Sequence, residues 1–199
     1  CSLSASPNPM VGCVITHKNK IIGRGSHKRS GENHAEINAI ENVITNLGDR
    51  SKEVLKESEL FVNLEPCTTF GKTPPCANSI KDHQIKKVYF SNADKAQKGF
   101  SKTYPEIEIE SGLLEAEGRE LNQGFFSRIE KGRPYIKCKV ASSLDGGIAL
   151  SSGQSKWITS LEARKDVHRM RAYSDAILTG IGTILNDNPH LTSRDSGLN

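Results

Sequence analysis

Short β-like runs open the chain, and a helical pattern follows them. Val11 to Thr16 and Lys20 to Gly25 predict two strands that join at Lys18-Asn19 in a hairpin. From His34 onward the apolar residues recur at helical spacing, and Gly48 is placed to end the helix. The predicted apolar face of this helix consists of Ile37, Ile40, Ile44 and Leu47.

Strands and helices alternate beyond that helix, which predicts a layered α/β domain over residues 1–131. The expected elements are a charged segment over Gly48 to Ser58 that forms a loop or the ragged end of the preceding helix, a buried strand over Leu60 to Leu64, a helix that starts at Thr73 to Cys76, a strand over Lys87 to Phe90, and an amphipathic helix marked by Leu114, Leu121 and Phe125 that ends at Gly132.

A second α/β pattern begins at Gly132-Arg133-Pro134 and extends over residues 132–199. It predicts a strand over Tyr135 to Ala141, a capping box at Thr159 to Glu162 that opens a helix, and a strand over Asp175 to Thr179. We expect this second domain to be incomplete. The chain also opens on Cys1 in a Ser/Pro/Asn stretch, so we expect a fragment or a processed start.

Composition and charge indicate which kinds of molecule this chain could bind. The 199 residues carry a formal charge of +4, and Lys and Arg are spread along the chain, so we expect no nucleic-acid partner. That balance suits a small anionic substrate. No apolar run approaches the roughly 20 residues that cross a bilayer, so we expect no membrane association. Five cysteines, an odd number, favour a reducing compartment, the cytoplasm, with some thiols used for metal.

His34-Ala35-Glu36, Pro66-Cys67 and Cys76 form the most informative motif. Their residue types and order match the established pattern of zinc nucleobase deaminases. His34, Cys67 and Cys76 would bind zinc and leave the fourth tetrahedral position open for water, whose pKa the metal lowers to roughly 7. His34 and Cys76 both fall at predicted helix N-termini, where the helix dipole favours a thiolate.

Glu36 is the predicted catalytic residue. It lies two residues from a ligand, so its carboxylate could take a proton from water and deliver it to the substrate without binding the metal. Proton transfer of this kind contributes about 10²–10⁴ in rate.

Simpler interpretations exist for the same residues. Asn33 and Glu36 could form an ordinary helix cap, and Cys76 could be a buried thiol. A structural zinc site would need a fourth ligand, which His27, His83 or Cys13 could supply. A deaminase for another nucleobase or nucleoside is the main enzymatic alternative.

The cysteine spacing departs from the general Cys-x-x-Cys pattern. Eight residues, Thr68 to Pro75, separate Cys67 from Cys76 and must bulge out between the ligands. This loop carries Lys72, which lies close to the metal and could bind an anionic substrate or could simply be a solvated loop lysine.

The chain resembles the bifunctional deaminase/reductase family of riboflavin biosynthesis. In the first half the resemblance rests on Pro7-Asn8-Pro9-Met10-Val11-Gly12-Cys13-Val14-Ile15, Gly25-Ser26-His27, His34-Ala35-Glu36, Leu64-Glu65-Pro66-Cys67 and Gly71-Lys72-Thr73-Pro74-Pro75-Cys76. In the second half it rests on Gly132-Arg133-Pro134-Tyr135, Lys139 to Gly146, Ser155-Lys156-Trp157-Ile158-Thr159 and Leu191-Thr192-Ser193-Arg194.

The resemblance implies a cytidine-deaminase-like three-layer α/β/α domain followed by the incomplete start of a dihydrofolate-reductase-like α/β domain. It implies zinc as cofactor and 2,5-diamino-6-ribosylamino-4(3H)-pyrimidinone 5′-phosphate as substrate, contacted by Asn8, His27 and Lys72. It leaves a homo-oligomer open. Taken alone, Asn8 is a turn residue and His27 a surface histidine.

For the second domain the resemblance implies NADPH as cofactor. The cofactor contacts would be Ala141, Trp157, Thr183 and Asp187, and the substrate contacts would be Ser155, Arg171, Leu191 and Arg194. The residues alone give only a weak phosphate-loop signal at Gly180-Ile181-Gly182 and favour a core position for Trp157.

Three departures from the family pattern qualify these expectations. The family's helix before the Pro-Asn-Pro motif is missing, and the segment between His34 and Cys67 is longer than usual. Asp94-Lys95-Ala96-Gln97 replaces Asp-Pro-Asn-Pro, which could alter the phosphate side of the substrate site. The later glycine-rich cofactor residues are absent, so we expect no useful reductase activity from these 199 residues alone.

Overall fold

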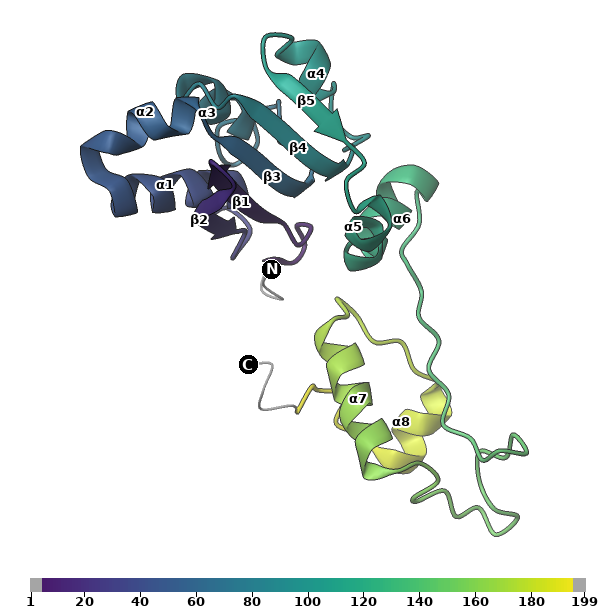
Figure 1. Cartoon of the computed structure of the whole chain (residues 1–199). Helices are drawn as coiled ribbons and strands as arrows, with labels where there is room; N and C mark the ends of the chain where they lie inside the picture. Colours follow the sequence, from purple (N-terminus) through teal and green to yellow (C-terminus); the bar gives the residue numbers. More distant parts are fainter. Residues whose placement is uncertain (1–4, 195–199) are drawn as a thin grey trace. The chain divides into compact units, whose positions relative to one another are not determined.

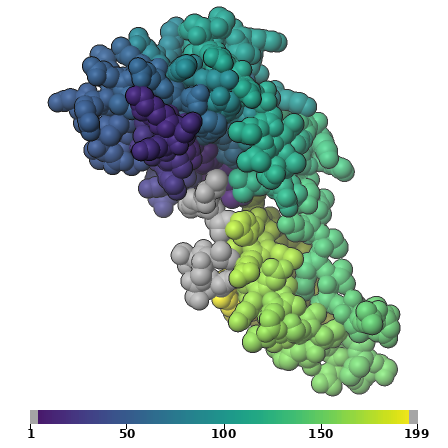
Figure 2. All heavy atoms as spheres, viewed as in Figure 1, coloured from purple at the N-terminus to yellow at the C-terminus, as the bar shows by residue number. Residues whose placement is uncertain are grey.

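The computed structural model describes residues 5–194, which fall into two compact units, 1–135 and 136–199 (Figure 1). Figure 2 shows one face of the first unit with all its heavy atoms drawn. The domain boundary expected between residues 131 and 132 stays a prediction.

A five-stranded mixed sheet in the order β2-β1-β3-β4-β5 forms the first unit. The strands β1 (Gly12–His17) and β2 (Lys20–Ser26) are antiparallel, and Lys18 and Asn19 both have positive φ, which confirms the predicted hairpin. β1 also pairs antiparallel with β3 (Glu59–Leu64). β3, β4 (Lys87–Asn92) and β5 (Glu108–Ser111) are mutually parallel.

The helix α1 (Ala35–Leu47) ends at Gly48 as predicted, and of its predicted apolar face Ile40 is buried and Leu47 packs against the core, but Ile44 does not. The buried residues are Ala35, Glu36, Ala39, Ile40 and Val43, whereas Ile44 is 40% exposed. The cause is a close approach of α1 to β2. A Cβ atom on Gly25 would lie 2.1 Å from the Ala35 carbonyl oxygen, so small residues rather than isoleucines face the strand.

Most of the charged segment after α1 is helical, so of the two interpretations predicted for Gly48 to Ser58, a loop or the ragged end of the preceding helix, the loop is wrong. A short 3-10 turn, η2 (Gly48–Arg50), leads into α2 (Ser51–Lys56). One side of α2 is buried through Ser51 and Leu55, while its charged residues face outward. This segment is helical although it has few apolar residues, because Leu55 packs into the core and holds it against the domain.

The helix α3 (Cys76–Asp82) connects the parallel strands β3 and β4 and starts where predicted. Together with α1 it covers one face of the sheet (Figure 1). The core between these layers contains Ile15, Ile40, Leu60, Ile80, Val88 and Phe90. The short helix α4 (Phe100–Thr103) adds Phe100 to this core.

The predicted helix marked by Leu114, Leu121 and Phe125 is two helices, α5 (Glu115–Leu121) and α6 (Gln123–Lys131), which meet at Asn122. The predicted apolar face is wrong, since Leu114 and Leu121 are exposed and Gly118 and Phe126 are buried. Gly118 faces Ser91 and Asn92 of β4, so α5 packs on the sheet at the carboxyl ends of its strands. Gly132, with φ of 64°, ends α6 as predicted.

The second unit contains α7 (Leu161–Ala172) and α8 (Ile181–Asp187). The strands predicted over Tyr135 to Ala141 and Asp175 to Thr179 are not formed, because the described residues of this unit contain no partner strand. Ser160 rather than Thr159 caps α7, and its side chain accepts a hydrogen bond from the Ala163 amide. Within residues 5–194 no helix has the length and apolar character required to span a bilayer.

Candidate active site

The parallel strands place chemistry-bearing residues at one edge of the sheet. Glu65, Pro66 and Cys67 directly follow β3, and Asp94 follows β4. His34 is the N-cap residue of α1, and Cys76 is the first residue of α3. Two helix N-termini therefore converge on the carboxyl ends of two neighbouring strands, as the sequence predicted for His34 and Cys76.

The donor atoms of His34, Cys67 and Cys76 all lie within 4.8 Å of one another. The Nδ1 atom of His34 lies 3.5 Å from Sγ of Cys67 and 3.2 Å from Sγ of Cys76. A tetrahedral zinc ion, with Zn–N of about 2.0 Å and Zn–S of about 2.3 Å, separates its nitrogen and sulfur donors by about 3.5 Å. The three side chains thus fit zinc without a change of fold.

Three side chains make up this group, and within the described part of the chain no fourth joins it. Of the candidates for a fourth ligand, His83 has Nδ1 2.8 Å from the Ser79 carbonyl oxygen, and His27 bonds to Asn8 and Asn33. Cys13, the third candidate, is buried in β1 and does not join the group. Three ligands are typical of catalytic zinc and four of structural zinc.

The two cysteines differ in their electrostatic state. A hydrogen bond from the Cys76 thiol is the main cause that lowers the pKa of Cys67 to about 4. The backbone N–H of Cys76 also donates to Cys67 Sγ at 3.1 Å. The same thiol hydrogen bond, together with burial, raises the pKa of Cys76. Cys67 is therefore the thiolate of the pair and is prepared to bind a cation.

Glu36 is buried in the first turn of α1, with 3% of its surface exposed. Burial is the main cause that raises its pKa to about 7, and the negative charge of Cys67 adds to the effect. The cap interpretation fails here, because His34 rather than Asn33 is the N-cap and Asn33 donates to Glu41 instead. A carboxyl group that titrates near neutral pH can both accept and return a proton.

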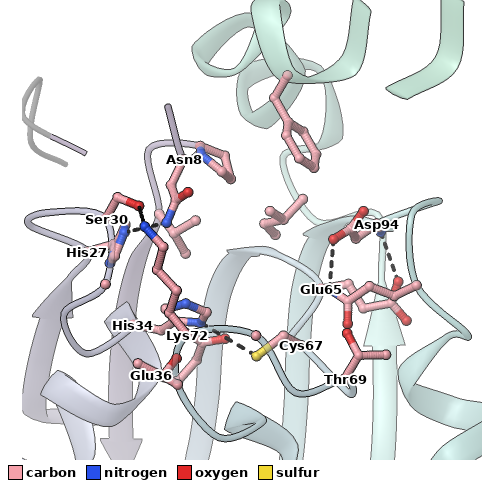
Figure 3. A pocket seen from close by; sticks show the side chains of 18 residues that line it. Asn8, His27, Ser30, His34, Glu36, Glu65, Cys67, Thr69, Lys72 and Asp94 are labelled. Atoms are coloured by element: carbon pink, nitrogen blue, oxygen red, sulfur yellow. Dashed lines mark hydrogen bonds between the residues drawn. The ribbon is translucent and has the colours of Figure 1, made fainter. Parts of the chain in front are cut away.

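A cavity of 340 Å³ opens beside these groups (Figure 3). His34, Glu36 and Cys67 line its floor. Asn8, His27 and Lys72, the predicted substrate contacts, also line it. Ser30, Glu65 and Phe125 also line the cavity, although the sequence predicted no role for them in the site. Asp94 and Gln97 line it too, and they belong to the segment whose departure from the family pattern was expected to affect the substrate site.

Lys72 crosses the mouth of the cavity from the loop between the two cysteines. Its Nζ atom lies 3.4 Å from Oγ of Ser30, and its aliphatic stem passes 3.6 Å from the position of a Cβ on Gly31 (Figure 3). Lys72 is exposed, and its ammonium group lies at the opening of the cavity.

Two asparagines that sequence reasoning missed fix the Pro7-Asn8-Pro9 segment. The Asn122 side chain accepts from Met10 N at 2.8 Å and donates to Met10 O at 2.9 Å. Asn63 on β3 donates to the same Met10 carbonyl and accepts from Gly12 N. An asparagine between two helices carries no periodic signal, so only the tertiary structure exposes this role.

Three predicted substrate contacts of the second unit lie near α7. Arg171 donates to the carbonyls of His190 and Thr192, which flank Leu191, and the Arg194 amide donates to His168. Ser155, Ala141 and Trp157 lie in irregular segments, and Thr183 and Asp187 lie on α8. The core position favoured for Trp157 is wrong, since Trp157 is 71% exposed and the Arg164 guanidinium lies 4.3 Å from its ring centroid.

Each half of the chain matches a known protein family. Residues 1–92 match the cytidine and deoxycytidylate deaminase zinc-binding region, and residues 134–199 match the RibD C-terminal domain. The riboflavin biosynthesis protein RibD of Aquifex aeolicus is 43% identical over 94% of this chain and 52% of its own length. RibD of Escherichia coli is 42% identical over 96% of this chain and 52% of its own length.

Solved structures agree with these matches. A diaminohydroxyphosphoribosylaminopyrimidine deaminase/5-amino-6-(5-phosphoribosylamino)uracil reductase from Thermotoga maritima is 39% identical, with a TM-score of 0.89 over 98% of this chain and 55% of that one. RibD of Acinetobacter baumannii gives a TM-score of 0.85. The chain spans about half the length of the curated relatives it matches. In its sequence, its fold and its zinc-binding group, the chain is similar to the RibD riboflavin biosynthesis proteins over about half of their length.

Proposed function

We propose that this chain catalyses the hydrolytic deamination of a phosphoribosylated aminopyrimidine, 2,5-diamino-6-ribosylamino-4(3H)-pyrimidinone 5′-phosphate. The observation that carries the proposal is the position of Glu36. This buried carboxyl group titrates near pH 7 and lies beside a three-donor group that opens onto a cavity.

His34, Cys67 and Cys76 would hold the metal in this proposal. Zinc, when bound, supplies a positive charge that lowers the pKa of water to roughly 7. Glu36 accepts a proton from the attacking water and delivers it to the ring nitrogen. It then assists protonation of the amine, which leaves as ammonia while a carbonyl oxygen takes its place. The burial of Glu36 supports this role, because it keeps the two protonation states close in free energy at neutral pH.

Substrate recognition is proposed for the opposite side of the cavity. Asn8 presents a polar amide to the cavity, and Lys72 brings a positive charge to its mouth (Figure 3). A pyrimidine edge suits the amide, and a phosphate suits the ammonium group. His27 supports Asn8 from behind through their hydrogen bond. We propose no nucleic-acid or membrane partner, and we leave homo-oligomer formation open to measurement.

A cytoplasmic location is part of the proposal, because Cys67 and Cys76 must stay reduced to bind the metal. In an oxidising compartment two thiols so close to each other would be exposed to disulfide formation.

Ammonia release distinguishes this substrate class from its main alternative. The purified chain is assayed with the phosphoribosylated pyrimidine, with cytidine and with single-stranded RNA. The proposal predicts turnover of the first substrate at the highest kcat/KM. A preference for cytidine or RNA would contradict the substrate assignment while leaving the deaminase chemistry in place.

For the second unit we propose that Ala141, Trp157, Thr183 and Asp187 contact NADPH in the family's reductase site, and that Ser155, Arg171, Leu191 and Arg194 contact its substrate. The described residues of this unit form no strand, and many of its apolar side chains are exposed, Ile136, Val140 and Leu178 among them. We therefore expect no NADPH-dependent turnover by these 199 residues. NADPH oxidation at 340 nm, where reduced nicotinamide absorbs, tests this directly.

A further inference from the structure

The side chain of Gln97, on the loop after β4, contacts the loop that carries Cys67. Its Oε1 atom accepts a hydrogen bond from the backbone N–H of Thr68 at 2.6 Å. Its Nε2 atom donates to Oδ2 of Asp94 at 2.7 Å. Because a carboxylate can only accept and a peptide N–H can only donate, these two partners fix the orientation of the Gln97 amide.

The Thr68 N–H belongs to the peptide group that links Cys67 to Thr68. The carbonyl of the same peptide group, Cys67 O, accepts from the Ala77 amide in the first turn of α3 at 3.2 Å. A peptide group is planar, so hydrogen bonds at both its ends fix its rotation about the Cys67 backbone. That rotation sets the direction in which Cys67 presents its sulfur.

Asp94 is itself firmly anchored. Its backbone N–H donates to Oε2 of Glu65 at 2.9 Å, and its Oδ1 atom accepts from the Ala96 amide at 3.0 Å (Figure 3). The other oxygen of Glu65 accepts from Phe100 N at 2.5 Å. Glu65 and Asp94 are both buried. The carboxylate that holds Gln97 is therefore part of a rigid network between the ends of β3 and β4.

We infer that Gln97 is a positioning residue for the metal ligand Cys67, acting through Asp94 on one side and the Cys67–Thr68 peptide on the other. The inference rests on the proposed role of Cys67 in zinc binding. Hydrogen-bond partners outside the ligand shell typically change metal affinity by about 10- to 100-fold. Gln97 therefore keeps the zinc bound longer without touching it.

The test measures zinc release from the full chain to an excess of a chromogenic chelator. Gln97→Ala removes the side-chain hydrogen bonds with Thr68 and Asp94 and is expected to release zinc about 10- to 100-fold faster than the unmodified chain. Lys95→Ala is the matched control from the same loop, since Lys95 is exposed and pairs with Glu130 instead. It is expected to release zinc at the unmodified rate.

Two further variants, Gln97→Glu and the double variant Gln97→Glu/Asp94→Asn, distinguish the loss of the Gln97–Asp94 hydrogen bond from a general disturbance of the loop. Gln97→Glu keeps the acceptor for Thr68 but places a carboxylate against Asp94, so zinc release should be fast. Adding Asp94→Asn restores one donor and one acceptor across this contact, because the asparagine amide can donate to the new glutamate. The double variant should regain slow release. If Gln97→Ala fails to fold, the comparison of Gln97→Glu with the double variant still tests the role of Gln97.

The outcomes separate the two proposals. Release at the unmodified rate from folded Gln97→Ala, or a double variant as fast as Gln97→Glu alone, would overturn the role of Gln97 and leave the metal site intact. An unmodified chain that binds no zinc would instead overturn the proposed function.

Discussion

His27 and Asn8 are joined by a hydrogen bond whose direction the surroundings determine. Nε2 of His27 lies 3.0 Å from Nδ2 of Asn8, and Nδ1 of His27 lies 3.1 Å from the Asn33 carbonyl oxygen. The carbonyl can only accept, so Nδ1 carries the hydrogen of a neutral ring and Nε2 accepts from the Asn8 amide. The Asn8 oxygen is then free to face the cavity (Figure 3).

Replacement of His27 should therefore impair substrate binding through Asn8. His27→Ala is expected to raise KM for the pyrimidine phosphate by roughly five- to tenfold, the equivalent of one lost hydrogen bond of about 1 kcal/mol. Asn8→Ala should have an effect of the same size, and the double variant should cost little more than either one. His83→Ala, which alters a histidine on the far end of α3, is the control. Independent, additive effects of His27 and Asn8 would contradict the coupling.

Lys72 should determine the preference for a phosphorylated substrate. Lys72→Met keeps the aliphatic stem but removes the charge, and it should raise KM for the phosphorylated pyrimidine by roughly 10- to 100-fold, as expected for a charged hydrogen bond of about 1.5–3 kcal/mol. The KM of the dephosphorylated nucleoside should change little. Lys98→Met, on the loop after β4, serves as the control. Equal changes for both substrates would exclude a phosphate contact.

Glu130 links stability to pH through the end of α6. Its hydrogen bonds with Arg119, the main cause, and with Lys95 lower its pKa to about 2. An unpaired glutamate titrates near 4.3, so the folded state holds fewer protons between these values. The stabilisation is present above pH of about 4.3 and is lost as the pH falls toward about 2.

Thermal unfolding of the metal-free chain over that pH range tests this linkage. The unfolding temperature of Glu130→Gln should fall less steeply than that of the unmodified chain as the pH is lowered. Glu120→Gln, an exposed carboxylate on α5, should keep the unmodified slope. Parallel curves for Glu130→Gln and the unmodified chain would show that the pair does not contribute.

Gly25 should be intolerant of any side chain. A Cβ atom there would lie 2.1 Å from Ala35 O and 2.4 Å from Ala39 N, and these backbone atoms cannot move aside independently. Gly25→Ala is expected to lower the free energy of unfolding by about 1–3 kcal/mol, as for other overpacked sites. Gly124→Ala has open space around its Cβ and lies in α6, so it should be neutral or slightly stabilising. Similar unfolding curves for the two variants would contradict the close packing of α1 on β2.

The metal-binding group could be predicted from sequence because its residue types, order and helix-start positions are dictated by the chemistry of zinc. His34 and Cys76 lie at helix N-termini as expected. The hairpin at Lys18-Asn19 could be predicted because two β-like runs are separated by only a short polar turn. In the structure both turn residues have positive φ.

Features that depend on distant partners could not be predicted. β5 is only four residues long, so its alternation of Glu108, Ile109 and Glu110 is too short to predict a strand by itself, and the pairing with β4 defines it. The buried face of α1 is set by the glycines of β2 rather than by its own isoleucines. The strands predicted in the second unit have suitable residues but no partner among those described.

The central claim is that Glu36 moves protons beside a metal that it does not bind. Zinc content and ammonia release, measured together on the unmodified chain and on Glu36→Gln, test it most directly. We predict one zinc per chain in both, with turnover of the pyrimidine phosphate reduced by about 10²–10⁴ or more in Glu36→Gln. A Glu36→Gln variant that retains its zinc and turns over substrate at the unmodified rate would contradict the account.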